Sequence, residues 1–394
     1  MKIAITSSGL GHVARGIETW ATSLAEALAE RGAGPERSGV GVTLFAGAPL
    51  SAGRRPSSAR LAIRVLPCLR RSDPRPQRLA SVFPGFTWRW GFRSAYGWEQ
   101  FSFWWRLWPI LRKERFDILH VQDPVVADWC RRFRNAGLVG TQVILANGTE
   151  EDIAFLSKFR YVQELSPHYL DHHRKPWPRD FRRWSIPNLV DTTEFSPRDR
   201  EACRRSLGLA ADAYVVLSAG AVNRERKRMG WLVDEFAAVR RDDAVLLLAG
   251  VIENQEGREL ASEAKARLGG RFRLIENVPH SEMPALYGAA DLFVLCSTAE
   301  ILGIVFLEAM ACGVPCIGHT FPVTEWVIGE GGTCVDMTRR GALTAEIEKY
   351  VESDFRRVRG RRARERAEKT FSRNVVADQM IRMYEEVEGA RRQV

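Results

Sequence analysis

The sequence contains no apolar run long enough to cross a membrane. A spanning helix needs about 20 consecutive, predominantly apolar residues, and no stretch of the 394 residues reaches that length. The chain opens with MKIAIT, which has the pattern of a strand and not that of a secretory leader. We therefore expect neither a membrane span nor secretion, and we expect a cytoplasmic protein.

Cysteine is also scarce, and the seven that are present form no recognisable set. Their number is odd, and several stand inside apolar runs, as buried reduced thiols do. Cys312 and Cys316 are separated by three residues, but no second pair and no histidine accompanies them at the spacing of a zinc site. These features argue against a disulfide framework, and we predict no metal site.

Acidic residues are fewer than basic ones. The chain has 58 lysines and arginines against 48 aspartates and glutamates, a formal net charge of +10. Such an excess favours anionic partners, among them nucleotide diphosphates, phospholipid head groups and nucleic acid, without choosing among them. The densest basic stretch, residues 356–369, alternates with apolar and acidic residues. That alternation is typical of a solvated helix face, so we expect no nucleic-acid partner.

What the chain does have is an alternation of short β-rich runs and longer helical patterns, which predicts parallel sheets with crossover helices. The alternation restarts after residue 188, and a hydrophobic content of 45% can fill two cores. We predict an α/β protein of two doubly wound, Rossmann-like lobes, residues 1–188 and 189–373. In such sheets ligands bind at the carboxyl ends of strands, so substrate is expected in the cleft between the lobes. Residues 51–58 and 70–78 lack periodicity and predict loops.

The most informative stretch is residues 297–315, STAEILGIVFLEAMACGVP, where a predicted strand ends and a helix begins. The backbone N–H groups of Ile304 and Val305 would be free at the helix start, and with the helix dipole they would form a site suited to a diphosphate. Ionised Glu300 and Glu308 only accept hydrogen bonds, which suits sugar hydroxyls. The residues alone fit a plainer arrangement equally well, with Glu300 complementing the helix dipole and Glu308 on a solvated face.

This stretch resembles the E-x7-E signature of retaining glycosyltransferases of the two-lobed GT-B architecture, in particular glycosyltransferase family 4. The flanking residues 287–294 and 308–315 fit the same pattern. The resemblance implies that Glu308 binds the ribose hydroxyls of a nucleotide diphosphate sugar and that Glu300 binds the donor sugar in a catalytic position. It also places the backbone amides of Gly303, Ile304 and Val305 near the diphosphate and the sugar.

By the same resemblance, the protein would transfer a hexose-type sugar to a glycan, a lipid-linked acceptor or a small molecule, with retention at the anomeric carbon. The final helical pattern, residues 374–394, would cross back to the first lobe, as in similar enzymes. No protein nucleophile is required. The loops have no D-x-D motif or other metal-ligand cluster, so we expect no metal or other cofactor and expect fixed positive groups to stabilise the leaving diphosphate.

The positive groups would come from residues 220–228, GAVNRERKR, after the first predicted strand of the second lobe. This loop resembles the phosphate loop of the family. We assign to the donor Gly220, Asn223, Arg224 and Lys227. Lys227 also takes a catalytic role. Ala221 stands where the family often has arginine, so Arg224 or Arg226 would supply the second cation, and a charged turn before the next helix is the alternative.

In the first lobe, Gly9 and Gly11 follow the first predicted strand, where the lack of a side chain lets the backbone approach the donor. Ala14 takes the last glycine position of a strict G-x-G-x-x-G fingerprint, which disfavours a hydride-transfer dehydrogenase. The resemblance places this loop near the donor sugar, with His12 and Glu18 as acceptor-side candidates. A packing or capping role at the helix entry fits His12 equally well.

Two further segments resemble family landmarks. Residues 120–124, HVQDP, resemble a strand-end H-x-H-D segment, and Asp123 is an acceptor-side candidate. Residues 147–150, NGTE, occupy the place where many members have His-Gly, which puts Asn147 at the catalytic contact with the donor sugar. Asparagine cannot shuttle a proton near neutral pH, and a turn residue before Gly148 is an equally good explanation.

The departures at Ala221 and Asn147, and Leu189 where glycine is usual, leave other functions open. A noncatalytic, sugar-nucleotide-binding partner subunit would bind the donor without turning it over. A GT-B-like epimerase or phosphorylase is the nearest enzymatic alternative, and the need for a separate acceptor would distinguish it from a transferase.

Aromatic residues are concentrated in residues 83–108, together with interleaved arginines. The segment contains the tryptophans Trp88, Trp90, Trp98, Trp104, Trp105 and Trp108. Trp98, Phe101, Trp105 and Trp108 repeat at helical spacing. Such a face would dock peripherally on the inner, anionic face of a membrane. The resemblance favours that contact, since many members reach lipid-linked acceptors. A helix packed into the first lobe and a wall of the acceptor site are the alternatives.

Overall fold

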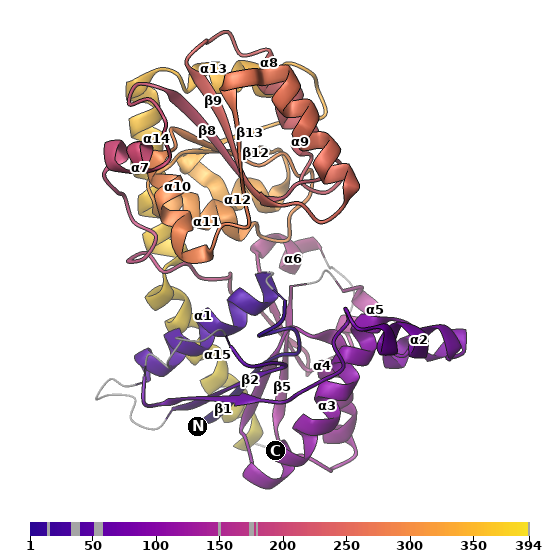
Figure 1. The fold of residues 1–394 in the computed structure, drawn as a ribbon. Helices are drawn as coiled ribbons and strands as arrows, with labels where there is room; N and C mark the ends of the chain where they lie inside the picture. The colour runs from indigo at the N-terminus through magenta and orange to yellow at the C-terminus, as the bar shows by residue number, and fades with distance from the viewer. Residues whose placement is uncertain are drawn as a thin grey trace. The chain divides into compact units, whose positions relative to one another are not determined.

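The computed structural model describes residues 1–13, 16–32, 40–50, 58–148, 151–172, 177–178 and 180–392. The chain divides into two compact units, one made of Met1–Asn188 with Val376–Val394 and the other of Leu189–Val375. Each unit is built on one parallel sheet with helices against it (Figure 1). The predicted α/β fold of two Rossmann-like units is confirmed. Residues 51–57 of the first predicted loop lie outside the described residues.

The first unit has a sheet in the order β3-β2-β1-β4-β5-β6-β7, with every pair of strands parallel. The strands are β1 Lys2–Ser7, β2 Gly41–Ala46, β3 Leu61–Val65, β4 Ile118–Val121, β5 Gln142–Asn147, β6 Tyr161–Glu164 and β7 Arg182–Ser185. Apart from Lys2, every residue of β1, β4 and β5 is buried. Burial on both faces explains their nearly continuous apolar runs. The strand order reverses between β1 and β4, the place where such sheets bind ligands.

Eight helices of this unit have described residues. They are α1 Gly16–Arg31, α2 Pro74–Val82, η2 Gly85–Trp90, α3 Ala95–Glu114, α4 Pro124–Asn135, α5 Ile153–Leu156, α6 Pro167–His172 and α15 Arg373–Arg392. Ser94 precedes α3, and its side chain accepts a hydrogen bond from the N–H of Gly97 and so caps the first turn. It lies beside α4 (Figure 1), where Trp104 stacks on Trp129 with ring centroids 4.8 Å apart.

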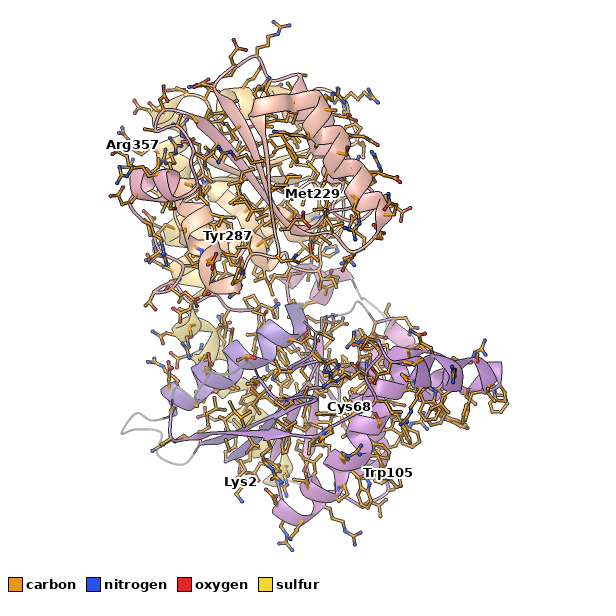
Figure 2. All side chains as sticks on the ribbon, in the orientation of Figure 1. Lys2, Cys68, Trp105, Met229, Tyr287 and Arg357 are labelled. Carbon is orange, nitrogen blue, oxygen red and sulfur yellow. The ribbon has the colours of Figure 1, made fainter. Side chains whose placement is uncertain are left out.

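The aromatic segment packs largely into this unit. Phe103 and Trp104 are fully buried, whereas Trp105 is 58% exposed and projects from α3 at the surface (Figure 2). One face of α3 therefore packs into the first unit, as the packing alternative requires, and the other face contacts solvent. The side chain of Trp88 lies outside the described residues.

The loop predicted for residues 70–78 is wrong from Pro74 onward, because α2 begins there. Proline suits the first turn of a helix, since its ring presets the helical φ and its missing N–H would have had no intrahelical acceptor. Two prolines in a short segment therefore looked like a loop but belong to a helix start.

Helix α15 belongs to the first unit from Val376 onward. The hydroxyl of its Tyr384 lies 2.7 Å from Nδ1 of His120 on β4, and both side chains are fully buried. Burial lowers the pKa of His120 to about 3, so this imidazole is neutral and holds the helix to the sheet. At the helix's two ends, Asp378 pairs with Arg31 and Arg391 with Asp117.

The second unit has a sheet in the order β10-β9-β8-β11-β12-β13, again parallel throughout. Its strands are β8 Tyr214–Ala221, β9 Ala244–Val251, β10 Phe272–Glu276, β11 Leu292–Val294, β12 Cys316–His319 and β13 Gly332–Val335. Its helices are α7 Arg200–Ser206, α8 Met229–Ala237, α9 Gln255–Leu268, η3 Gly269–Arg271, η4 His280–Glu282, α10 Met283–Ala289, α11 Ile304–Ala311, α12 Pro322–Ile328, η5 Gly329–Gly331, α13 Ala342–Lys349, α14 Ser353–Arg366 and η6 Ala367–Phe371. The strand order reverses between β8 and β11.

All seven cysteines are free thiols, and Cys312 and Cys316 are buried. Among the described residues, no helix combines the length and the apolar character that crossing a bilayer requires.

Candidate active site

The second unit brings Lys227 and Glu300 together at the point where its strand order reverses. The lysine follows β8 and the glutamate follows β11, and these two strands are paired. Lys227 Nζ lies 2.5 Å from Glu300 Oε1, and each side chain is 17% exposed. A parallel sheet of this kind binds its ligand at the carboxyl ends of the strands where their order reverses, and the partly enclosed ion pair lies there.

Asn223 fixes the loop that carries Lys227. Its Oδ1 accepts a hydrogen bond from the backbone N–H of Lys227 at 2.7 Å, and its carbonyl oxygen accepts one from the N–H of Met229. The loop also starts at a glycine with a φ of 138°, Gly220, against which the aliphatic part of Lys227 packs. Asn223 and Gly220 therefore shape the loop, and Lys227 presents its charge to Glu300.

Arg224 is not brought to this pair. Its guanidinium bonds to Glu263 on α9 at 2.5 Å, and both side chains are well exposed. Its backbone N–H bonds to Glu256 of the same helix. The sequence placed Arg224 and Lys227 together at the donor, but the structure separates their charges. The side chain of Arg224 points toward α9 and not toward the loop after β11.

Glu308, the second carboxylate of the motif, is buried. Its Oε2 accepts a hydrogen bond from the hydroxyl of Tyr287 at 2.8 Å, and its Oε1 lies 2.8 Å from Nε2 of His280. Tyr287 lies on α10 (Figure 2) and is fully buried. Burial raises the pKa of this tyrosine, and the adjacent Glu308 carboxylate raises it further, so the phenol stays a donor. The solvated-face alternative for Glu308 does not describe this structure.

The start of α11 requires glycine. Gly303, at the N-cap position, has a φ of 75°, and a Cβ there would lie 2.8 Å from the ring of Phe306. With no side chain at the cap, the amides of Ile304 and Val305 face outward from an uncapped helix end, which attracts anions. Gly303, Ile304 and Val305 thus lie beside Glu300 in the chain at the same end of the sheet.

The first unit gathers a second polar cluster at its own switch point, between β1 and β4. Asp123 Oδ2 accepts a hydrogen bond from the backbone N–H of Ser8 at 2.7 Å. A Cβ on Gly9 would lie 2.2 Å from Oε1 of Glu18, and Gly11 has a φ of 94° with the carbonyl of Ala48 against it. Position 11 therefore needs glycine, whereas a side chain on Gly9 would displace the carboxylate of Glu18.

Glu99 links this cluster together and was not predicted. Its carboxylate is fully buried on α3, where Oε2 lies 3.0 Å from Nε2 of His12 and Oε1 lies 2.5 Å from a guanidinium nitrogen of Arg71. Burial tends to raise the pKa of Glu99, but hydrogen bonds from Arg71 and His12 outweigh it and lower that pKa. Arg71 also lies over the ring of Tyr96, 4.2 Å from its centroid. A glutamate within an aromatic helix has no local sequence signal of such a role.

Asp123 is fully buried and should make stability depend on pH. Burial raises its pKa from 3.8 to about 6, although the hydrogen bond from Ser8 opposes the rise. The folded state therefore binds a proton more readily than the unfolded state between pH 4 and 6, and the free energy of unfolding should fall as pH rises through that window. Asp123→Asn keeps a hydrogen-bond acceptor for Ser8 and removes the ionisable group, and with it this dependence of stability on pH.

We expect the stability of Asp123→Asn relative to the natural protein to rise by up to about 3 kcal/mol between pH 4 and 7. Urea unfolding of both proteins at several pH values measures the difference. A stability difference that does not change with pH would contradict the burial argument.

Asn147 makes hydrogen bonds other than those that join Asp123 and Glu99 to the polar cluster. Its Nδ2 donates to Glu164 Oε2 at 2.9 Å, and its Oδ1 accepts from the backbone N–H of Glu151. Glu164 pairs in turn with Arg183. Both ends of the Asn147 amide are thus used within the protein, as the turn alternative requires, and its contact with a donor sugar stays a prediction. Thr149 and Glu150, the next residues of this motif, lie outside the described residues.

His280 is a second residue that the sequence did not point out. It reaches Glu308 from a different segment, 28 residues upstream, and only the fold brings the two together. In the described parts of the chain, no group of three or more histidine, cysteine, aspartate or glutamate residues is arranged to hold a metal ion.

The comparisons with known proteins cover the segment that holds these residues. Residues 199–369 match the family model described as Glycosyl transferases group 1. N-acetyl-alpha-D-glucosaminyl L-malate synthase of Bacillus anthracis is 28% identical over 209 residues, 52% of this chain and 53% of that protein. Phosphatidyl-myo-inositol mannosyltransferase of Mycobacterium leprae is 28% identical over 291 residues, 69% of this chain and 74% of that protein. The chain spans about half the length of most of the curated relatives it matches.

Solved structures extend the likeness to both units. Sucrose-phosphate synthase from Thermosynechococcus elongatus has a TM-score of 0.77 at 21% identity, over 99% of both chains. HepE from Anabaena, solved in complex with UDP and glucose, has a TM-score of 0.72 at 15% identity, over 98% of this chain and all of that one. These likenesses show the GT-B fold. The segment that carries Lys227, Glu300 and Glu308 accordingly matches the glycosyl transferases group 1 model and lies within a GT-B fold.

Proposed function

We propose that the protein is a retaining glycosyltransferase that takes a hexose-type sugar from a nucleotide diphosphate donor. The observation that carries the proposal is the 2.5 Å contact between Lys227 and Glu300 at the reversal of strand order, inside the segment that matches the family model. Two oppositely charged side chains with limited access to solvent can take the two parts of such a donor, since lysine suits phosphate and a carboxylate suits sugar hydroxyls.

Donor binding would replace the ion pair with contacts to the ligand. The diphosphate would accept hydrogen bonds from Lys227 Nζ and from the amides at the start of α11, and Glu300 would then accept from hydroxyls of the sugar. Glu308, held by Tyr287 and His280, would accept from the ribose hydroxyls. This assignment uses Lys227, Glu300, Glu308 and the α11 amides together.

The reaction we propose needs no protein nucleophile. The bond between the anomeric carbon and the phosphate oxygen breaks, negative charge builds up on the leaving diphosphate, and the acceptor oxygen attacks from the same face. Lys227 and the α11 amides would stabilise that charge, which is the usual source of the largest rate effect when charge develops in a transition state. We propose no cofactor for this step.

We propose that the acceptor, a glycan, a lipid-linked molecule or a small molecule, is bound by the polar cluster of the first unit. His12, Glu18 and Asp123 were the predicted residues, and the buried Glu99 joins His12 to Arg71. Hydrogen-bond donors and carboxylate acceptors side by side suit an acceptor substrate with several hydroxyl groups. Gly9 and Gly11 would let the chain come close to it or to the donor sugar.

A donor-consumption assay tests the proposed function. The purified protein is incubated with UDP-, GDP-, ADP- and TDP-sugars, with and without a panel of glycan, lipid and small-molecule acceptors, and products are identified by mass spectrometry. We expect one donor to be consumed only when an acceptor is present. Consumption without an acceptor would indicate an epimerase, and binding without any turnover would indicate a noncatalytic partner subunit.

We further propose peripheral contact with an anionic membrane through the first unit. Four large apolar side chains of the α2 to α3 region are at least 38% exposed, namely Val82, Phe86, Trp90 and Trp105. Exposed basic residues of α2 and α3 accompany them, namely Arg75, Arg78, Arg106, Arg112 and Lys113. Exposed aromatic and basic side chains together favour the interface of an anionic bilayer.

Cosedimentation with vesicles tests this contact. We expect the natural protein to bind vesicles that contain phosphatidylglycerol, and the double variant Phe86→Ser with Trp105→Ser to bind at least about tenfold more weakly. Val251→Ser, which changes an exposed apolar residue of the second unit, is the control and should bind normally. Equal binding by all three proteins, or none by the natural one, would rule the surface out.

A further inference from the structure

A second basic pocket lies in the second unit, away from Lys227 and Glu300. It has a volume of about 560 Å³ and is lined by residues of α10 and α14, the start of α7, and the turns that precede β11 and β12. Lys227 and Glu300 instead follow β8 and β11. Because the strands are parallel, residues that precede strands and residues that follow them lie at opposite edges of the sheet. The pocket therefore opens at the other edge of the sheet from Lys227 and Glu300, and the two sites meet through the buried Tyr287, which lines the pocket and bonds to Glu308.

Arginine dominates the lining of this pocket. The basic residues are Arg198, Arg200, Arg356, Arg357, Arg361 and Arg364. The acidic residues are Asp291 and Glu365, which leaves an excess of four positive charges. Arg357 lies on α14 at the outer surface of the unit (Figure 2). The basic stretch that the sequence indicated as a solvated helix face thus forms one wall of a hollow.

The one buried carboxylate of the pocket cannot neutralise the arginines around it. Asp291 Oδ1 lies 2.6 Å from Arg200 and 3.4 Å from Arg356, and its Oδ2 lies 2.6 Å from the buried Arg204. Three guanidinium groups therefore share a single negative charge. Burial lowers the pKa of Arg204, and repulsion from Arg200 and Arg356 adds to that effect while Asp291 opposes it. A further anion beside this group would reduce the repulsion.

Two other arginines of the pocket are available to such an anion. Arg198 and Arg361 are exposed, and within the described ranges of the chain neither guanidinium has a protein acceptor. Arg357 and Arg364 differ, since they pair with Asp354 and Glu368. Guanidinium groups bind phosphate oxygens through paired N–H donors, and a volume of several hundred Å³ is that of a small-ligand site.

We propose that this pocket binds a small anion with one or more phosphate groups, such as a diphosphate, at a second site of the second unit. Arg198 and Arg361 would supply the direct contacts, and the positive cluster around Asp291 would supply the field that attracts the anion. The shared chemistry fits free pyrophosphate and the phosphates of a small metabolite alike.

Calorimetric titration with inorganic pyrophosphate tests the proposal on the full-length chain. Lys227→Ala serves as the background, so that the loop after β8 does not contribute a phosphate contact. In that background we expect pyrophosphate to bind, and the added changes Arg198→Gln and Arg361→Gln to weaken its Kd by about tenfold or more. Arg340→Gln, a change at an exposed arginine outside the pocket, is the matched control and should leave the Kd unchanged.

Both arginines are exposed, so the midpoint of thermal unfolding without ligand should be the same in all variants, which separates lost binding from lost folding. All titrations are made at one ionic strength, set with sodium chloride. Nonspecific attraction of pyrophosphate to the positive charge of the protein depends on ionic strength, so at constant ionic strength a difference between variants reflects the two arginines. No binding in the Lys227→Ala background, or equal binding with and without Arg198 and Arg361, would overturn the proposal.

Discussion

Lys227→Ala is expected to lower kcat/KM for sugar transfer by about 100-fold to 1,000-fold. The change removes the ammonium group that lies 2.5 Å from Glu300, and with it the charge that would stabilise the leaving diphosphate. Kinetic assays with the donor found by the consumption assay measure the loss. The fold should persist, since each side chain of the pair reaches solvent and the loop is fixed by Asn223.

Lys265→Ala is the matched control for this change. Lys265 is an exposed lysine on α9 of the same unit, and its ammonium group bonds to the carbonyl of Gly269 at the end of that helix. Its loss should leave kcat/KM within about twofold of the natural value. A Lys227→Ala protein as active as the Lys265→Ala protein would show that the donor's phosphates lie elsewhere.

The largest effect on stability is expected from Asp291→Ala. This change leaves the buried Arg204, with a side chain only 4% exposed, without its carboxylate. It also removes the acceptor for the backbone N–H of Val215 on β8. Breaking a buried pair from one side typically costs about 3 to 5 kcal/mol, because the remaining charge stays in a poorly solvated place.

The control for this prediction is Asp243→Ala. Asp243 pairs with Arg241 at 2.6 Å, but both side chains are substantially exposed, and exposed pairs contribute at most about 1 kcal/mol. Urea unfolding of the two variants compares a buried and an exposed carboxylate of the same unit. Similar losses in both would mean that the cluster around Asp291 is far better solvated than its burial indicates.

The α/β fold was predictable because its signal is repeated many times along the chain. Each central strand is a short apolar run buried on both faces, and each is followed by a helix or a loop, so an error in one element leaves the alternation intact. The loop predicted for residues 70–78 failed for a local reason, since proline marks both loops and the first turn of helices.

The residues of the candidate site were predictable where they belong to a recognisable motif. Glu300, Gly303 and Glu308 belong to one strand-turn-helix segment, and the structure keeps them at one end of the sheet. His280 and Glu99 contact Glu308 and His12 from segments 28 and 87 residues away. Pairings over such distances depend on strand order, which a single sequence does not specify.

Arg224 shows a different limit of the sequence. Residues 220–228 contain three arginines and one lysine, and the sequence does not indicate which of them points toward the end of β11. The structure directs Arg224 toward Glu263 on α9 and Lys227 toward Glu300. Side-chain direction within a tight loop depends on its turn geometry, here the contact between Asn223 and Lys227.

The central claim is that the second unit binds a nucleoside diphosphate through Lys227 and Glu308. Calorimetric titration of UDP, GDP, ADP, CDP and TDP into the natural protein, Lys227→Ala, Glu308→Gln and Lys265→Ala tests it most directly. We predict that one nucleotide binds the natural and Lys265→Ala proteins equally, and that its Kd is weakened at least about tenfold in the other two. Binding of no nucleotide, or binding of equal strength in all four proteins, would contradict the claim.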